Sequence, residues 1–150
     1  VTKRGICHLG FFEGKDQSEA LDQMYETWPG ALFTERTEQI RPIVERIFRK
    51  GDSGNPRSFN LLVKGTNFQI NVWKALLSIP EGCVVSYRDV ASQLGNSKTY
   101  RAVANAVAMN PIALLIPCHR VISNSGEIHN YRWGSARKKA LIGWEAARTA

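Results

Sequence analysis

The last cysteine of the chain lies in the segment "IPCHRVISNSGEIHNYRWG" (residues 116–134), where Cys118 has a proline on one side and His119 on the other. A free thiol has a pKa of about 8.5 and is only a few per cent thiolate at neutral pH, so a nucleophilic cysteine needs a group that takes its proton. His119 is the adjacent imidazole. The pair therefore indicates nucleophilic chemistry at sulfur, provided that the fold brings the two side chains together.

Two features of the sequence around Cys118 decide whether its thiol and the His119 imidazole can meet. Neighbouring side chains on an extended strand point to opposite faces, so contact between Cys118 and His119 needs a turn or a bridging water, and Pro117 favours such an irregular path. An imidazole that acts as a base usually needs a carboxylate to orient it, and Glu127 and Glu145 are the nearest acids downstream. The alternative is a structural cysteine buried at a strand end, with a histidine on the surface.

The elements that must position these residues begin with two short helices, predicted over residues 86–95 and 97–110 on either side of a "GNS" turn. Two helices joined in this way are typical of a helix-turn-helix motif, although ordinary packing of an alanine-rich helix gives the same pattern. The predicted caps and ends are Ser86, Gly95, Ser97 and Asn110-Pro111. Small residues on the second helix would let a nucleic-acid backbone approach closely; they are Ala102, Ala104, Ala106 and Ala108.

Three further elements complete the carboxyl half. Thr66 and Gln69 have capping-box spacing ahead of an apolar stripe, which predicts a core helix that ends before Pro80. Residues 112–116 ("IALLI") resemble a strand. Residues 135–148 predict a closing helix, with Ser135 as its cap.

The amino-terminal half predicts a strand over residues 4–12, then a helix that starts at a capping box formed by Asp16 and Glu19 and ends before Pro29. A second helix is expected over residues 34–50, with Pro42 in its first turn or at a kink. The segment "GDSGNPRS" (residues 51–58) has the composition of a flexible connection, so we place a domain boundary there.

Composition sets the class of protein and hints at the partner. The chain of 150 residues has 43% hydrophobic and 22% charged residues, no apolar run near the roughly 18 residues of a membrane span, and three widely spaced cysteines. These cysteines predict free thiols in a reducing cytosol and no zinc site. Of the net charge of +7, residues 84–150 contribute +6 (9 Lys/Arg against 3 Asp/Glu), which favours a polyanionic partner for the carboxyl half.

Several motifs then resemble one known family. "PCHRVI", preceded by "SYRDVA" and "RAVANAVAMNP" and followed by "NYRWG" and "RKKALIGWE", is similar to the O6-alkylguanine-DNA alkyltransferases, and the motifs keep the family's order. The likeness covers residues 59–150 closely. It implies an α+β fold, with a small, truncated ribonuclease-H-like α/β part in residues 1–58 and a mostly helical, winged helix-turn-helix-like domain in residues 59–150.

The resemblance also implies an activity: irreversible, single-turnover transfer of the alkyl group from O6-alkylguanine to Cys118 after the base is flipped out of the duplex, with O4-alkylthymine as a further candidate substrate. His119 would take the thiol proton through a water, Glu145 would support His119, and Asn110 would hold the network. Tyr87 would donate a hydrogen bond to the departing guanine, which eases its release.

Other positions match the DNA-binding and pocket residues of the family. Arg101 would fill the gap left by the flipped base, in a recognition helix that uses the minor groove. The DNA-contacting set implied by the match is Tyr87, Arg101, Ala102 and Arg120. The substrate-pocket set is Val121, His129, Tyr131 and Ser135. His129 and Asn130 depart from the usual family residues, which leaves the accepted range of adducts open.

The expected partner is double-stranded DNA that contains O6-alkylguanine, bound by a cytoplasmic monomer without a metal or cofactor. The chain could also be cut from an adaptive-response regulator that carries a similar repair domain. The competing interpretations are a non-catalytic lesion binder, a helix-turn-helix regulator and a cysteine hydrolase. Cys118 argues against the binder, and the lack of a nucleophile-elbow motif argues against the hydrolase.

Overall fold

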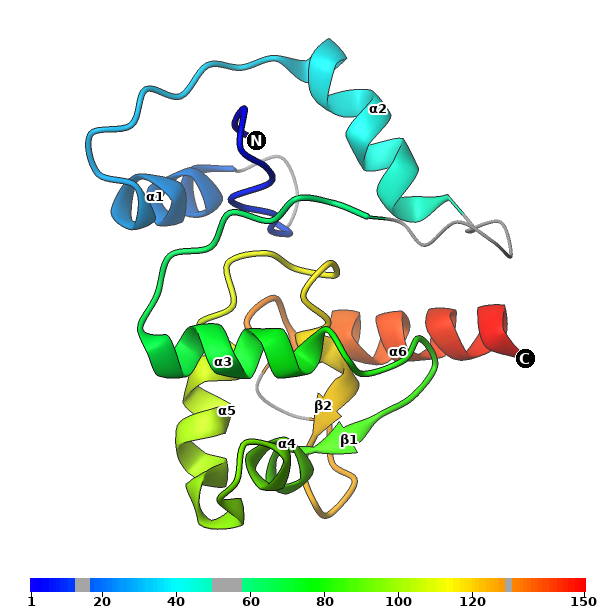
Figure 1. Ribbon diagram of the computed structural model, residues 1–150. Helices are drawn as coiled ribbons and strands as arrows, with labels where there is room; N and C mark the ends of the chain where they lie inside the picture. The colour runs from blue at the N-terminus through cyan, green and yellow to red at the C-terminus, as the bar shows by residue number, and fades with distance from the viewer. Residues whose placement is uncertain (13–16, 50–57, 129–130) are drawn as a thin grey trace. The chain divides into compact units, whose positions relative to one another are not determined.

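The computed structural model describes residues 1–12, 17–49, 58–128 and 131–150. Within these residues it has an α+β fold with six α-helices, two short 3-10 helices and one two-stranded sheet (Figure 1). The chain divides into two compact units. One comprises Val1–His8 and Phe12–Leu62, and the other comprises Leu9–Phe11 and Val63–Ala150. The α+β class expected from the sequence is confirmed at this level.

The first unit is built on helices α1 (Ser18–Thr27) and α2 (Thr37–Phe48). Both predicted helices are present, and α1 ends before Pro29 as expected; Pro42 lies inside α2, beyond its first turn. The predicted capping residue Asp16 and most of the connection at residues 51–58 lie outside the described residues.

The strand predicted over residues 4–12 is not formed. The segment makes only isolated bridges, among them Ile6 with Leu61 and Leu9 with Ile112. A strand needs a continuous partner for its backbone groups, and single bridges supply none beyond each pair.

Helix α3 (Asn67–Leu76) begins the second unit and supplies its core. Thr66 and Gln69 form the predicted capping box, each side chain accepting a hydrogen bond from the other residue's backbone N–H. Trp73 is buried, and its indole Nε1 donates to the Ala106 carbonyl at 2.9 Å. This contact ties α3 to the helix that carries Ala106.

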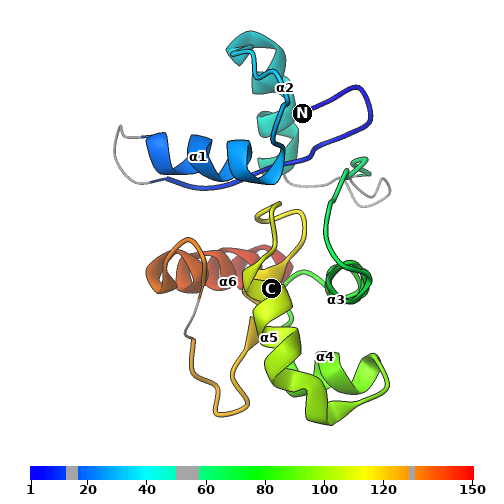
Figure 2. The same cartoon turned by 90° about the vertical axis from the view of Figure 1, so that its left-hand side faces the viewer.

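Helices α4 (Tyr87–Gln93) and α5 (Tyr100–Ala108) are joined through the 3-10 helix η1 (Ser97–Thr99), and they cross rather than run parallel (Figure 2). Ser86 forms a capping box with Asp89, and Gly95 has the left-handed φ of +95° that ends a helix. The cap predicted at Ser97 is wrong: the Asn96 side chain accepts the backbone N–H of Lys98 instead. A 3-10 turn thus precedes α5.

The sheet consists of β1 (Val85–Ser86) and β2 (Val121–Ile122), which pair in parallel with Val85 opposite Val121. Helix α4 starts directly after β1, and the 3-10 helix η2 (Cys118–Arg120) directly precedes β2. The short ladder therefore brings the start of α4 to the turn that holds the last cysteine.

Helix α6 (Ser135–Thr149) closes the unit. Ser135 is its first residue and makes no cap; the N-cap is Gly134, whose φ of +92° favours glycine, so the predicted cap is one residue too late. No helix among residues 1–12, 17–49, 58–128 and 131–150 is long and apolar enough to cross a membrane.

Candidate active site

The 3-10 helix η2 decides how Cys118 and His119 are presented. Pro117 stands at its N-cap, and both Cys118 (3% exposed) and His119 (0% exposed) are buried. A 3-10 helix turns the chain by about a third of a revolution per residue, so neighbouring side chains need not point to opposite sides. The irregular path expected after Pro117 is confirmed.

Asn110 organises the segment that leads to this turn. Its side chain is fully buried; Nδ2 donates to the carbonyls of Ile112 (3.2 Å) and Ile116 (2.9 Å), and Oδ1 accepts the Ile112 N–H at 2.9 Å. Nδ2 also lies 3.0 Å from the Cys118 Sγ. One amide thus shapes the segment and holds the sulfur in place.

Residues 112–116 are therefore not the predicted strand. The segment folds around Asn110, and Leu114 has a φ of +64°, a left-handed conformation that costs a non-glycine residue about 1 kcal/mol or more. Four of the five apolar side chains that suggested a strand are buried in this turn instead: Ile112, Ala113, Leu114 and Ile116.

Glu145 lies on α6, 3% exposed, and is shared by two consecutive residues of η2. Its Oε1 is 2.7 Å from His119 Nε2, and Arg120 donates to both of its oxygens, from Nε and Nη2, each at 2.8 Å. Burial raises the pKa of Glu145, but the hydrogen bonds from His119 and Arg120 outweigh it and bring that pKa to about 2. The carboxylate is ionised at any physiological pH.

The bond to Glu145 fixes the orientation of His119. With Nε2 on the carboxylate, the other ring nitrogen, Nδ1, is buried and has no hydrogen-bond partner among the described residues. Nδ1 is therefore the ring atom available to take a proton. A buried thiol followed in the chain by a base that a carboxylate orients has the groups that nucleophilic sulfur chemistry requires.

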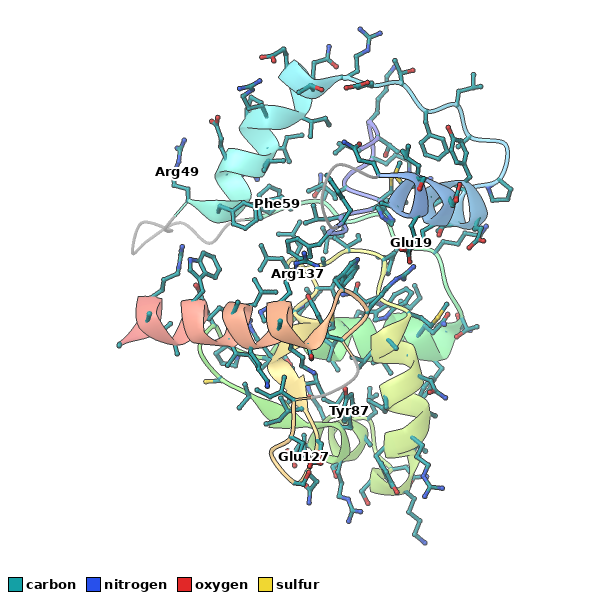
Figure 3. All side chains as sticks on the ribbon, turned by 180° about the vertical axis from the view of Figure 1, so that it is seen from behind. Glu19, Arg49, Phe59, Tyr87, Glu127 and Arg137 are labelled. Atoms are coloured by element: carbon teal, nitrogen blue, oxygen red, sulfur yellow. The ribbon has the colours of Figure 1, made fainter. Side chains whose placement is uncertain are left out.

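Burial raises the pKa of the Cys118 thiol, and the Asn110 hydrogen bond, the Lys138 charge and Tyr131 act in the opposite direction. Burial also raises the pKa of Tyr87, at the first turn of α4 (Figure 3), and of Tyr131. Both phenols therefore keep their protons at neutral pH and can donate hydrogen bonds. The Tyr131 hydroxyl is buried, and its ring packs edge-on against Trp133 with centroids 5.3 Å apart.

The residues of α5 that are predicted to contact DNA are exposed at the start of the helix. Arg101 and Ala102 are exposed at the start of α5, and the guanidinium groups of Arg88 and Arg101 lie 5.3 and 5.7 Å from the Tyr100 ring centroid. Ala106, by contrast, is buried and faces the interior.

Arg120 is not on that surface. Its Nε and Nη2 bind Glu145, and its Nη1 donates to the Ile79 carbonyl, so the guanidinium is engaged inside the unit. In this placement Arg120 holds Glu145, and its contact with DNA stays a prediction.

The predicted pocket residues are only partly brought together. Val121 is fully buried beside the cysteine turn, Tyr131 lies near the sulfur, and Ser135 is exposed at the start of α6. His129 lies outside the described residues, as does Asn130. No group of three or more His, Cys, Asp or Glu in the described part of the chain is placed to hold a metal ion.

Sequence reasoning missed Lys138, which is 1% exposed and reaches the site from α6. A signal was present: Lys138, Leu141 and Glu145 have the i, i+3, i+7 spacing of one helix face, and all three are buried. A lysine on the same helix face as a core leucine and the buried Glu145 indicates a buried cation.

Comparisons with known proteins agree with this chemistry. The model of the 6-O-methylguanine DNA methyltransferase DNA-binding domain matches residues 67–147, more than half of the chain. A methylated-DNA–protein-cysteine methyltransferase of Methanosarcina barkeri is 38% identical over 94% of this chain and 84% of its own length. The Escherichia coli bifunctional transcriptional activator/DNA repair enzyme Ada is 36% identical over 97% of this chain. The chain spans about two fifths of that relative (41%).

A solved structure is also similar to part of this chain. The crystal structure of the Mycobacterium tuberculosis methyltransferase OGT in complex with DNA has a TM-score of 0.59 and 47% identity. The match covers 61% of this chain and 56% of that chain.

Proposed function

The chain belongs to the 6-O-methylguanine DNA methyltransferase family, and we propose that it repairs DNA by moving the alkyl group of O6-alkylguanine to Cys118. One observation carries this proposal. The buried Cys118 sulfur is held by Asn110 at 3.0 Å, in a turn whose next residue, His119, is bound to the ionised Glu145. A thiol with a histidine base oriented by a carboxylate is equipped to attack carbon.

The reaction balances without a metal or cofactor step. As an Sγ–carbon bond forms, the bond between the alkyl carbon and O6 breaks, and its electron pair stays on the guanine. The thiol proton passes to His119, whose free Nδ1 receives it through a water, and the imidazolium is balanced by Glu145. Tyr87 keeps its proton at neutral pH and donates a hydrogen bond to the leaving purine. The guanine anion then takes a proton from water, and the His119 imidazolium returns its proton to water, so the net change moves the alkyl group to sulfur and one proton to guanine.

The transfer happens once for each protein molecule. The thioether that forms is stable, because its removal would need a second nucleophile to attack the alkyl carbon and expel the cysteine thiolate. We therefore expect a single turnover, with O4-alkylthymine as a further substrate to be tested.

The partner is double-stranded DNA. Helix α5 with its exposed Arg101 and Ala102 is the recognition helix of a winged helix-turn-helix, and Arg101 fills the gap left by the flipped base. Residues 1–58 form a truncated ribonuclease-H-like domain, and residues 59–150 form the DNA-binding and acceptor domain. The protein acts as a cytoplasmic monomer.

Intact-protein mass spectrometry tests the function directly. Incubation with duplex DNA that contains O6-methylguanine should add one methyl group to the wild type and none to Cys118→Ser. Cys83→Ser is the matched control, because Cys83 is an exposed free thiol, and this variant should gain the methyl group like the wild type. An unchanged wild-type mass together with tight binding to the lesion would instead establish a non-catalytic binder.

A further inference from the structure

Lys138 is a buried lysine that has no role in the proposed reaction as described above. Its side chain lies on the inner face of α6 and is only 1% exposed, which is rare for lysine because an ammonium loses its hydration when it is buried. Nearby Arg137 and Lys139 lie on the same helical turn, yet Lys139 is exposed. Burial is therefore a property of this position and not of the basic segment as a whole.

The contacts of Lys138 leave its charge uncompensated. Nζ donates to the Val121 carbonyl at 2.5 Å and lies 5.9 Å from the Tyr87 ring centroid. Among the described residues, no carboxylate lies within salt-bridge distance of Nζ, and the nearby Glu145 is already paired with His119 and Arg120. A carbonyl and a ring face are weak substitutes for a counter-ion.

The position is also unfavourable for the helix itself. Lys138 is in the first turns of α6, which has no acidic residue in its first turn, and the N-terminal end of a helix repels cations. Figure 3 labels Arg137 at this end of the helix. Burial and the helix dipole both count against a cation here, so stability does not account for it.

The sulfur of Cys118 supplies the missing charge. Val121, whose carbonyl holds Nζ, follows the η2 turn that carries Cys118, so the ammonium is anchored at the base of that turn. We propose that the Lys138 ammonium is the counter-charge of the Cys118 thiolate, and thus a positioning residue that stabilises the nucleophile electrostatically. This inference deepens the proposed function and rests on it.

The charges of the site then balance in pairs. When the thiol proton reaches His119, the imidazolium is balanced by Glu145, and the thiolate is balanced by Lys138. The Lys138 charge lowers the pKa of Cys118, and the Cys118 charge in turn raises the pKa of Lys138 against the effect of burial. The other polar and charged side chains that act on this thiol or on its neighbours are Tyr87, Asn110, His119, Tyr131, Arg137 and Glu145.

The test replaces the charge and keeps the length of the side chain. Lys138→Met removes the ammonium, Lys138→Arg retains a cation, and Lys139→Met is the matched control on the exposed side of the same turn. Alkylation of Cys118 by iodoacetamide, followed by peptide mass spectrometry across a pH series, reports the thiolate without any need for DNA. We expect the pH midpoint of Lys138→Met to rise by about one unit or more, with about tenfold less thiolate at pH 7.5. Lys139→Met should match the wild type.

A folded Lys138→Met protein with an unchanged midpoint would overturn the proposal. If this variant does not fold, the reciprocal measurement decides. Titration of the Lys138 side chain by NMR should give a lower pKa in Cys118→Ser than in the wild type, because linkage requires the coupling to act in both directions. An unchanged Lys138 titration would overturn the proposal equally. Methyl transfer from O6-methylguanine DNA is measured in parallel, so a wild type that reacts with iodoacetamide but takes no methyl group would refute the repair function and leave the charge pair standing.

Discussion

Glu145→Gln should lower stability at neutral pH and remove part of the pH dependence of unfolding. Folding brings the pKa of Glu145 from its ordinary value of 4.5 to about 2. At 1.36 kcal/mol per unit this is about 3 kcal/mol, and we expect about 2 kcal/mol after allowance for solvent screening. Because the folded pKa is depressed, this stabilisation is complete above pH 4.5 and is lost as the pH falls towards 2.

Urea unfolding at pH 7 and pH 2.5 measures the effect. The wild type should lose most of the Glu145 contribution between these two values, whereas Glu145→Gln starts lower and should lose less. The matched control is Glu81→Gln, because Glu81 also pairs with an arginine, Arg148 at 3.0 Å, but is 37% exposed. A pair of that kind is worth roughly 0 to 1 kcal/mol. If Glu145→Gln and the wild type differ by the same free energy at both pH values, the shared carboxylate does not stabilise the fold in the way described.

Two further predictions concern DNA and the amide at the sulfur. Arg101→Ala should keep methyl transfer from the free base but lose about tenfold to a hundredfold on duplex DNA, since extrusion of a base costs a few kcal/mol; equal rate losses on both substrates would contradict the role of Arg101 in extrusion. Asn110→Ala should lower the free energy of unfolding by about 2 to 4 kcal/mol in urea titrations, because it removes the buried hydrogen bonds to Ile112 and Ile116. It should also raise the pKa of Cys118, seen as a higher midpoint in thiol alkylation, because the bond from Asn110 lowers that pKa.

The elements predicted best from sequence are those whose signal is local. The capping boxes at Thr66 and Ser86 each depend on residues three apart, and both are formed. The cap at Ser97 was misplaced by one residue because Asn96 can accept the same kind of hydrogen bond.

The two missed strands have a common physical cause. The apolar runs at residues 4–12 and 112–116 have the composition of strands, but composition cannot supply the partner that a ladder needs. In the second run, the partner for the backbone is the Asn110 side chain, and Leu114 takes a left-handed φ that no propensity predicts. Hydrogen bonds to the Asn110 side chain, rather than the strand preference of the apolar residues, determine the backbone path of residues 112–116.

In the candidate site, too, the residues with a local signal are predicted and those that depend on distant partners are not. The sequence predicts Cys118 and His119 as a nucleophile and its base because the two residues are adjacent. It leaves two candidates for the carboxylate that orients His119, Glu127 and Glu145, because these are the nearest acids downstream. The sequence does not predict that Arg120 binds Glu145 or that Lys138 is buried at Val121. These partners lie 25 and 17 residues away, and charged residues are expected at the surface. Only the fold turns both side chains inward.

The single carboxylate shared by His119 and Arg120 has an evolutionary consequence. Each of the three positions is held by the other two, so a change at one alone leaves a buried charge or donor without its partner. Mutant libraries that vary one position at a time will score all three as intolerant. Acceptable replacements should emerge only when the three codons are randomised together, and natural relatives should exchange these residues as a set.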